Sequence, residues 1–399
     1  MLENNLVKEA FDTSYNVDQL MLKLSSMIDK ELDNNSVIFI DEIQEAKDAI
    51  TPIKFLVQNS KYRFIFSGSL LGIKMKDIDS IPVGFLKILN LYPLDFEEFL
   101  WANKVLTKTI EYLLVCFKNL KNVDEIIHKQ MMSIFNVYLT VGGMPKAVSN
   151  FIESNDLRKV NEELNIIDIG YRKDITKYDK EEKLQIQEIY DLIPSELNAS
   201  NKRFILKNMN EKARFYQYEE SFAWIKNSGI GLFVHNVDNL IYPLLASKER
   251  TLFKLFLCDV GLLTYKLYSG NQISILNGHS TLNYGAVYEA VVAQELNFHG
   301  FSLFYNNDKK RGEIDFLVEK NHKIIPIKVK SEKDYHRHSA FNNLMNIKAF
   351  NYDFGYVLCN ENVEVKGKEI CLPVYMIMFL KQEKHNENQI IKLDISKLI

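Results

Sequence analysis

Two short apolar runs, each ending in polar residues, constrain the fold of the first hundred residues most. They are residues 36–42 (SVIFIDE) and 62–69 (YRFIFSGS). A continuous apolar run of this length is typical of a strand buried on both faces, as in a parallel sheet. The stretch between them, 49–58, has helical spacing. The sequence therefore predicts a βαβ unit with a right-handed crossover.

The polar residues at the ends of these two strands form the first candidate site. Asp41 is placed to hold Mg²⁺, often through water, and Glu42 is placed to orient or deprotonate an attacking water. Ser67 or Ser69, at the end of the neighbouring strand, is placed to sense a γ-phosphate. The alternative is structural, because many parallel strands end in an acidic residue that caps the next helix.

Beyond these strands, the pattern predicts a third short strand at 88–95, a helix at 96–102 and helices from 103 to 165, broken at 141–145 (VGGMP). Amphipathic helices between 179 and 238 end in a predicted hairpin, and helices followed by a hairpin favour a winged helix.

The last section predicts a second α/β unit, in which a helix at 284–298 comes first. Four strands follow it, at 302–305, 312–319, 323–330 and 354–359.

This last unit carries a second group of charged residues, with Glu289 on its helix and Asp315, Lys328 and Lys330 on its strands. The stretches GEIDFLV (312–318) and IPIKVKS (325–331) resemble the restriction-endonuclease-like core, in which two carboxylates hold Mg²⁺ and a lysine steadies the attacking water. Lys328 stands where that core has a carboxylate, and a cation there repels a metal ion. A solvated lysine face or an inactive nuclease-like fold is therefore expected ahead of active cleavage.

A basic stretch before residue 216 is a candidate nucleic-acid contact. Five cations face one acid, Glu211, and Phe215, Tyr216 and Tyr218 lie beside them; the cations are Lys202, Arg203, Lys207, Lys212 and Arg214. A basic helix with aromatic residues suits phosphate contacts. The alternative is a solvated charged surface. The whole chain has a net charge of −3, which excludes a strongly basic nucleic-acid coat.

Several ordered motifs together resemble a prokaryotic family of AAA-type ATPases that carry an uncharacterised C-terminal region. The motifs are FIDEIQE (39–45), FSGSLLG (66–72), PVG (82–84), LYPLDFEEFL (91–100), VGGMP (141–145), YRKDITKY (171–178) and DVGLL (259–263). The resemblance implies ATP and Mg²⁺ as cofactors. It implies that Asp41 holds the metal, Glu42 is the catalytic base and Ser67 or Ser69 is the sensor.

With this resemblance, the expected fold class is α/β with four parts. Residues 1–102 are a partial P-loop NTPase sheet of the AAA type, 103–175 a helical lid, 176–250 a winged-helix-like section, and 251–399 a restriction-endonuclease-like α/β domain of unknown function.

One part of the family pattern is missing from these 399 residues. No G-x-x-x-x-G-K-[ST] loop occurs before the Asp41 strand or anywhere else. That loop supplies the backbone N–H groups and the lysine that hold the phosphates. We therefore expect ATPase activity to be defective here, with an N-terminally truncated or decayed sequence as the first explanation and a self-standing pseudo-ATPase as the second. A non-catalytic nucleic-acid-binding module and a metal-dependent nuclease remain alternatives.

The remaining sequence features bear on the location of the protein, the state of its cysteines and its partners. The N-terminus has no signal peptide and no apolar run spans a bilayer, so we expect a cytoplasmic protein without membrane contact. The four cysteines form no C-x-x-C pair, which favours free buried thiols. Besides nucleic acid, an unknown protein partner is expected, and the oligomeric state is left open.

Overall fold

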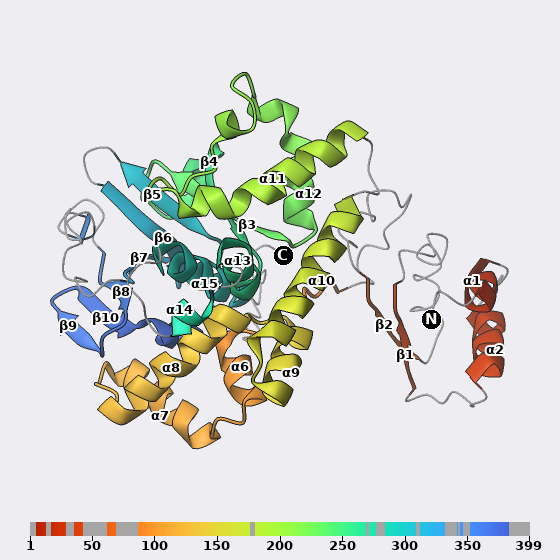
Figure 1. The fold of residues 1–399 in the computed structure, drawn as a ribbon, viewed down its shortest axis with the longest axis horizontal. Helices are drawn as coiled ribbons and strands as arrows, with labels where there is room; N and C mark the ends of the chain where they lie inside the picture. The colour runs from red at the N-terminus through yellow and green to blue at the C-terminus, as the bar shows by residue number, and fades with distance from the viewer. Residues whose placement is uncertain are drawn as a thin grey trace, which may run out of the picture. The chain divides into compact units, whose positions relative to one another are not determined.

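The computed structural model describes most of the chain in two units. Unit 1 comprises residues 1–92, 171–192 and 205–232, and unit 2 comprises 93–170, 193–204 and 233–399. The residues that the structure describes are 5–12, 17–28, 36–42, 62–68, 87–175, 180–268, 271–276, 284–308, 312–331, 341, 344–345 and 352–382. Figure 1 labels the helices and strands of the described residues.

In unit 1, the two predicted strands form a parallel pair. β1 (Val37–Ile40) lies beside β2 (Arg63–Phe66), with Ile40 opposite Phe66. The predicted helix at 49–58 lies outside the described residues. Burial on both faces was wrong for these strands, because Phe39 is 53% exposed and Ile65 is 51% exposed. Within the described part of the chain each strand has one neighbour, which leaves these side chains uncovered.

The other described elements of unit 1 are helical. α1 (Asn5–Asp12) contacts α2 (Val17–Ile28). Later in the chain come the second part of α10 (Leu157–Ile175), most of α11 (Lys180–Asn198), and α12 (Glu219–Asn227). Arg172 of α10 forms an ion pair with Asp191 of α11, which ties these two helices together.

The first part of unit 2 is helical, as predicted. After α6 (Phe96–Ala102) come α7 (Thr107–Asn119), α8 (Glu125–Val141), α9 (Pro145–Ser154) and α10. The predicted break at 141–145 is confirmed. Gly142 has a φ of +75° at the end of α8, and Pro145 opens α9 at a position that needs no N–H donor.

The third strand predicted at 88–95 was wrong. Residues 87–95 run without strand pairing, and the Leu91 side chain is 100% exposed. The Leu94 N–H donates to the Gly143 carbonyl, so the segment is fixed by the end of α8 instead of by a sheet.

The second part of unit 2 is built on an eight-stranded mixed sheet. The spatial order is β4-β3-β5-β6-β7-β8-β10-β9. The strands are β3 (Gly231–Val237), β4 (Lys248–Leu257), β5 (Phe304–Asp308), β6 (Gly312–Lys320), β7 (Lys323–Val329), β8 (Gly355–Cys359), β9 (Glu364–Lys366) and β10 (Glu369–Pro373). Neighbours β7 and β8 are parallel, whereas β6 is antiparallel to both β5 and β7.

The hairpin predicted as a wing belongs to this large sheet. β3 and β4 form its end, where β3 pairs with β5 in parallel. The predicted boundary at residue 250 falls inside β4. The apolar side chains that suggested a small hairpin serve the C-terminal core, so the section 176–250 is not a separate winged-helix-like domain.

Helix α15 (Tyr284–Phe298) is the central helix of unit 2, and its predicted bounds are confirmed. Every residue from Ala286 to Leu296 is buried. The helix contacts α13 (Val260–Tyr268), β4, β7 and the 3₁₀ helix η6 (Val374–Phe379) (Figure 1). Such all-round burial means that its charged residues need partners inside the protein.

The four cysteines are free and buried, as predicted; they are Cys116, Cys258, Cys359 and Cys371. Among the described helices, none combines the length and apolarity that crossing a membrane requires.

Candidate functional site

The carboxyl ends of β1 and β2 bring two of the predicted catalytic residues together. Ser67 Oγ donates a hydrogen bond to Asp41 Oδ1, and the Ser67 N–H donates to the Ile40 carbonyl at 3.0 Å. Parallel pairing explains this, because it puts both carboxyl ends at one edge. Asp41 and Glu42 are both exposed. Ser69 lies outside the described residues.

Glu42 follows Asp41 with a left-handed backbone, φ +56°. This is unusual for a residue with a side chain, and such conformations gather at functional sites and turns. An exposed carboxylate at a strand end is a suitable ligand for Mg²⁺ or its water shell. The Asp41 edge therefore fits the metal side of a nucleotide site, while the sequence supplies no loop for the phosphate side.

The predicted nuclease-like residues meet in a buried group that we call the lysine–carboxylate cluster. It contains Glu289, Glu313 and Asp315 with Lys202, Lys254 and Lys328. Glu289 of α15 lies at its centre, because it accepts from Lys202 Nζ at 2.5 Å and from Lys254 Nζ at 3.0 Å. Lys254 of β4 also pairs with Glu313, and its ammonium lies 5.2 Å from the centre of the Tyr305 ring.

The other half of this cluster is centred on Asp315. Lys328 Nζ donates to Asp315 Oδ1 at 2.8 Å and to the Glu313 carbonyl at 3.2 Å. The Val329 N–H donates to Asp315 Oδ2 at 2.7 Å. β6 and β7 are adjacent and antiparallel, so residues from both strands reach the same place. Lys330 is not among these contacts, and its N–H donates to the Leu358 carbonyl.

Electrostatics keep Glu289 and Lys254 of this cluster ionised despite their burial. Burial opposes the charge on Glu289, but the ammonium groups of Lys254 and Lys202 outweigh it and lower the pKa of the carboxyl to about 2. Burial likewise opposes the charge on Lys254, whose side chain is 0% exposed. Glu289, Glu313 and Asp315 nevertheless raise the pKa of that ammonium above its usual range.

This cluster does not fit a catalytic metal site. The three carboxylates place ligand atoms within 4.8 Å of one another, as a metal ion needs. Three lysines already neutralise them, with Lys254 between Glu289 and Glu313. The solvated lysine face predicted for the β7 strand was wrong for Lys328, whose side chain is 16% exposed and paired.

Lys254 and Glu313 were not predicted as members of this cluster. A single lysine in the apolar run TLFKLFL (251–257) was the available signal, because a charge inside a buried strand requires a partner.

The basic stretch does not form the predicted helix. Between 201 and 218 the structure has two short 3₁₀ helices, η3 (Leu206–Asn208) and η4 (Phe215–Gln217). Lys202 belongs to the lysine–carboxylate cluster, and Arg203 donates to Asn201 Oδ1 at 2.9 Å. The exposed cations are Lys207, Lys212 and Arg214. They belong to unit 1, whereas Lys202 and Arg203 belong to unit 2.

Two of the family-like motifs, VGGMP and DVGLL, meet in unit 2. Asp259 accepts from the Gly143 N–H at 2.7 Å and from the Leu262 N–H at 2.9 Å. A Cβ on Gly261 would lie 2.4 Å from the Val141 carbonyl oxygen. Burial raises the pKa of Asp259 to about 6, against the backbone donors that lower it. These motifs therefore have a packing role.

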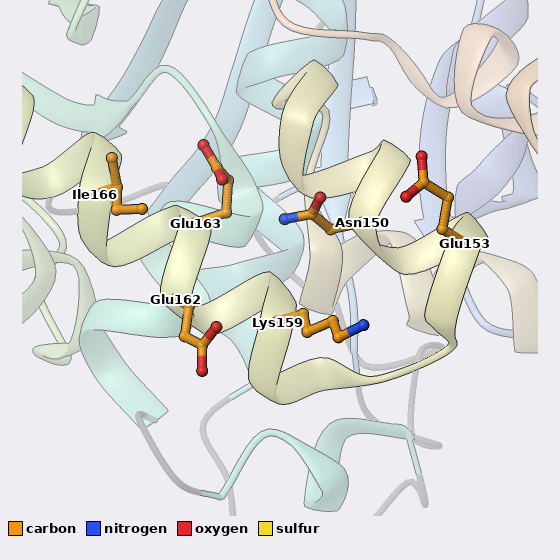
Figure 2. A pocket seen from close by; sticks show the side chains of 6 residues that line it. All are labelled: Asn150, Glu153, Lys159, Glu162, Glu163 and Ile166. Atoms are coloured by element: carbon orange, nitrogen blue, oxygen red, sulfur yellow. The ribbon is translucent and has the colours of Figure 1, made fainter.

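A surface hollow lies between α9 and α10 (Figure 2). Its lining residues are Asn150, Glu153, Lys159, Glu162, Glu163 and Ile166. Glu153, Lys159 and Glu162 are exposed, so the hollow presents solvated charge and offers no buried polar group to hold a ligand.

Comparisons with known proteins place this geometry in context. Three family models match, described as AAA domain (residues 2–100), Domain of unknown function (DUF8612) (residues 132–272) and Domain of unknown function (DUF4143) (residues 284–377). No curated protein matches the chain.

Among solved structures, the Walker-type ATPase PABY2304 of Pyrococcus abyssi is similar at 12% identity and a TM-score of 0.35; the match covers 65% of this chain and 82% of that one. The chain therefore contains an AAA domain followed by two domains of unknown function, which is the arrangement expected of the AAA-type ATPase family that its motifs resemble.

Proposed function

We propose that this chain is a degenerate AAA-type ATPase, which keeps the magnesium side of the nucleotide site and lacks a phosphate loop within its 399 residues. One observation carries the proposal. Ser67 donates a hydrogen bond to Asp41 at the carboxyl ends of adjacent parallel strands, inside the matched AAA domain. Side chains so placed suit a metal-bound γ-phosphate.

The roles follow from this placement. Asp41 holds Mg²⁺ through water, Glu42 orients the attacking water, and Ser67 fixes the Asp41 carboxylate and senses the phosphate. The β- and γ-phosphates have no N–H cradle and no P-loop lysine to neutralise them. We therefore expect weak binding of Mg·ATP and no measurable turnover.

Equilibrium dialysis of the 399-residue chain against Mg·ATP tests this proposal. We expect no saturation below millimolar ATP and a phosphate release rate equal to that of an Asp41→Asn variant. Micromolar affinity together with turnover that Asp41→Asn abolishes would contradict the degenerate site. A Glu42→Gln variant separates the two functions, because it removes a base and leaves the metal ligand in place.

A second proposal is nucleic-acid binding through unit 1. Lys207, Lys212 and Arg214 are exposed, and the nearby Tyr216 ring is 73% exposed. Cations beside an open aromatic face suit phosphate contact and base stacking. We expect a salt-dependent shift of single-stranded DNA that is lost when all three cations are changed to Ala. A Lys108→Ala/Lys118→Ala/Lys121→Ala variant, which also removes three exposed cations, is the matched control. An unchanged shift in the Lys207/Lys212/Arg214 variant would exclude this contact.

A further inference from the structure

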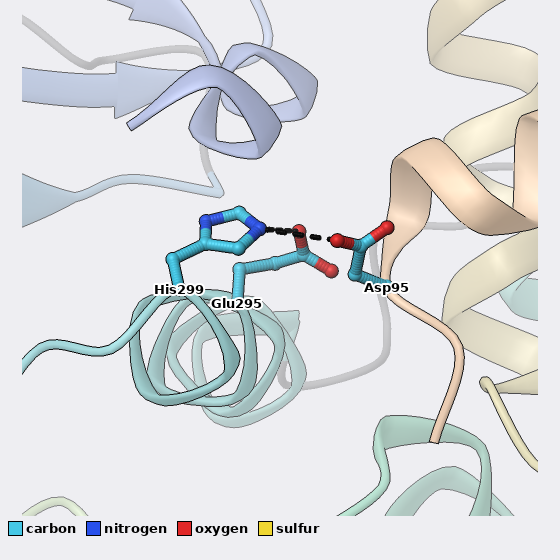
Figure 3. Close-up of side chains that lie close together, drawn as sticks. All are labelled: Asp95, Glu295 and His299. Carbon is cyan, nitrogen blue, oxygen red and sulfur yellow. Dashed lines mark hydrogen bonds and ion pairs between the residues drawn. The ribbon is translucent and has the colours of Figure 1, made fainter. Parts of the chain in front are cut away.

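Three side chains from distant parts of the sequence meet beside the end of α15 (Figure 3). Glu295 lies on the last turn of α15, and His299 comes four residues after it, directly after the helix ends at Phe298. Asp95 is the N-cap of α6. Each of the three offers one ligand atom, and these atoms lie within 4.8 Å of one another. Neither the sequence patterns nor the proposed nucleotide site account for this group, which we call the Asp95–Glu295–His299 cluster.

Glu295 has one satisfied oxygen and one unsatisfied oxygen. Oε1 accepts from the Phe96 N–H at 2.9 Å and from the Tyr138 hydroxyl at 3.3 Å. Oε2 is buried, and no described donor lies within hydrogen-bonding distance of it. Its partner in the cluster, His299 Nε2, is 3.7 Å away. A buried carboxylate oxygen without a donor is costly, because burial and the nearby Asp95 carboxylate both oppose its charge. A cation beside Oε2 would offset that cost.

The imidazole of His299 is oriented for such a ligand. Its Nδ1 lies 2.9 Å from the Leu380 carbonyl oxygen, which only accepts, so Nδ1 carries the proton. The other ring nitrogen, Nε2, faces both carboxylates, at 3.3 Å from Asp95 Oδ2 and 3.7 Å from Glu295 Oε2. A histidine that binds a metal through one nitrogen usually donates from the other to a carbonyl in this way.

The two oxygens of the Asp95 carboxylate have different partners. Oδ1 accepts from the Glu98 N–H at 2.8 Å and so caps α6, while Oδ2 faces His299. Lys381 is the other cation near it, with its Nζ 3.8 Å from Asp95 Oδ2. That ammonium lies 2.6 Å from Glu97 Oε2, so Glu97 is its closer partner.

We propose that Asp95 Oδ2, Glu295 Oε2 and His299 Nε2 bind one divalent transition-metal ion, such as Zn²⁺ or Mn²⁺. One imidazole with two carboxylates suits these ions, whereas Mg²⁺ and Ca²⁺ prefer oxygen ligands alone. The ion would satisfy the orphaned oxygen of Glu295 and join the start of α6 to the end of α15. Its role is structural, because two of the three ligands are almost fully buried.

The lysine–carboxylate cluster provides a comparison within the same protein, because it also groups three possible metal ligands. It also brings three acidic side chains within reach of one ion, but Lys254 occupies the position between Glu289 and Glu313. In the Asp95–Glu295–His299 cluster the described ammonium is that of Lys381, which lies 3.8 Å from Asp95 Oδ2 and pairs more closely with Glu97, at 2.6 Å. A metal ion should therefore bind to one group and not to the other.

The test measures Zn²⁺ bound per chain after dialysis of the chelator-treated protein against ZnCl₂, with Co²⁺ absorption as the spectroscopic probe. We expect one ion per chain in the wild type and in Glu313→Gln, the control from the lysine-filled cluster. His299→Gln and Glu295→Gln should each weaken Zn²⁺ binding by at least tenfold while retaining the wild-type circular dichroism.

Thermal unfolding gives a second readout that needs no variant. At a Zn²⁺ concentration a hundred times Kd, the unfolding equilibrium constant of the wild type should fall about a hundredfold. Absence of bound Zn²⁺, or equal binding in His299→Gln, would overturn the proposal. So would a melting temperature of the wild type that does not change when Zn²⁺ is added.

Discussion

Gly142 lies where the VGGMP motif packs against Asp259 of the DVGLL motif. Its φ of +75° belongs to the left-handed region, and a Cβ there would lie 2.3 Å from Asp259 Oδ1. Asp259 is the acceptor for the Gly143 and Leu262 N–H groups. A side chain at Gly142 would therefore strain the backbone and displace the Asp259 carboxylate, which accepts the Gly143 N–H just after α8.

We predict that Gly142→Ala lowers the free energy of unfolding by about 3 kcal/mol, from left-handed backbone strain and weakened buried hydrogen bonds. Urea denaturation measures this change. The matched control is Gly170→Ala on α10, where an added Cβ meets nothing within 4 Å and helix propensity predicts a gain of up to about 1 kcal/mol. Equal effects of the two substitutions would show that the Asp259 contact is unimportant.

At the scale of elements, Lys254 joins β4 to α15 and β6. Its ammonium pairs with Glu289 and Glu313 and has no exposed surface. Lys254→Met keeps the length of the side chain and removes the charge, which leaves three carboxylates facing two lysines. Removing one partner from a buried ion pair costs about 3–5 kcal/mol.

We therefore predict that Lys254→Met destabilises unit 2 by about that amount, measured by denaturant unfolding. Mg²⁺ should raise the melting temperature of this variant, since a cation then fills the gap, and should leave the wild type unchanged. A wild type stabilised by Mg²⁺ to the same degree would contradict the view that lysine replaces the metal in this cluster.

The same cluster makes stability depend on pH in acid. The pKa of Glu289 is lowered to about 2, from an ordinary 4.5, so its ionised form stabilises the folded state above pH 4.5. That contribution, about 3 kcal/mol, is lost as the pH falls from 4.5 to 2. The difference in unfolding free energy between the wild type and Glu289→Gln should shrink across this window. Glu125→Gln, which breaks an exposed pair with Lys129, should show a small difference that changes little.

Elements with strong periodicity were predictable from the sequence. The bounds of α15 agree with the prediction because a long, mostly apolar run without Pro, whose one Gly lies in the first turn, is compatible only with a helix. The bounds of β6 and β7 agree within one residue because apolar residues continue between clear turns. The prediction of a strand at 88–95 was wrong because an apolar run is also compatible with a loop. Here the Leu94 N–H fixes that loop by donating to the Gly143 carbonyl. The short strands β9 and β10 gave no pattern long enough to recognise.

The site residues were predictable only where they lie close to a recognisable strand end. Asp41 and Ser67 meet because parallel pairing puts both strand ends at one edge. Glu289, Asp315 and Lys328 were singled out, but their neutralisation by Lys254 and Lys202 was not. Asp95 and Glu295 are 200 positions apart, and a single sequence contains no signal for such a contact.

At the scale of the whole molecule, all eight strands of the large sheet and helices α6 to α15 follow residue 92. We predict that a fragment of residues 87–399 unfolds cooperatively with a melting temperature within about 4 °C of the full chain, measured by circular dichroism. A fragment beginning at residue 104 is the control. It lacks α6 with its buried Phe96, Phe99 and Leu100, and should lose cooperative unfolding. An 87–399 fragment without near-ultraviolet signal would show that residues 1–86 are needed.

The hydrogen bond from the Phe96 N–H to Glu295 has a consequence for synthesis on the ribosome, because its partners are 199 positions apart. At about 5–20 residues per second, roughly 10–40 s pass between translation of the two codons. During that interval α6 and α8 have emerged without the helix that covers them. Phe96 and Phe135, fully buried in the finished protein, are then uncovered on the nascent chain. Slow translation of the C-terminal half would lengthen this exposure and make the emerging polypeptide a client for chaperones that bind apolar segments.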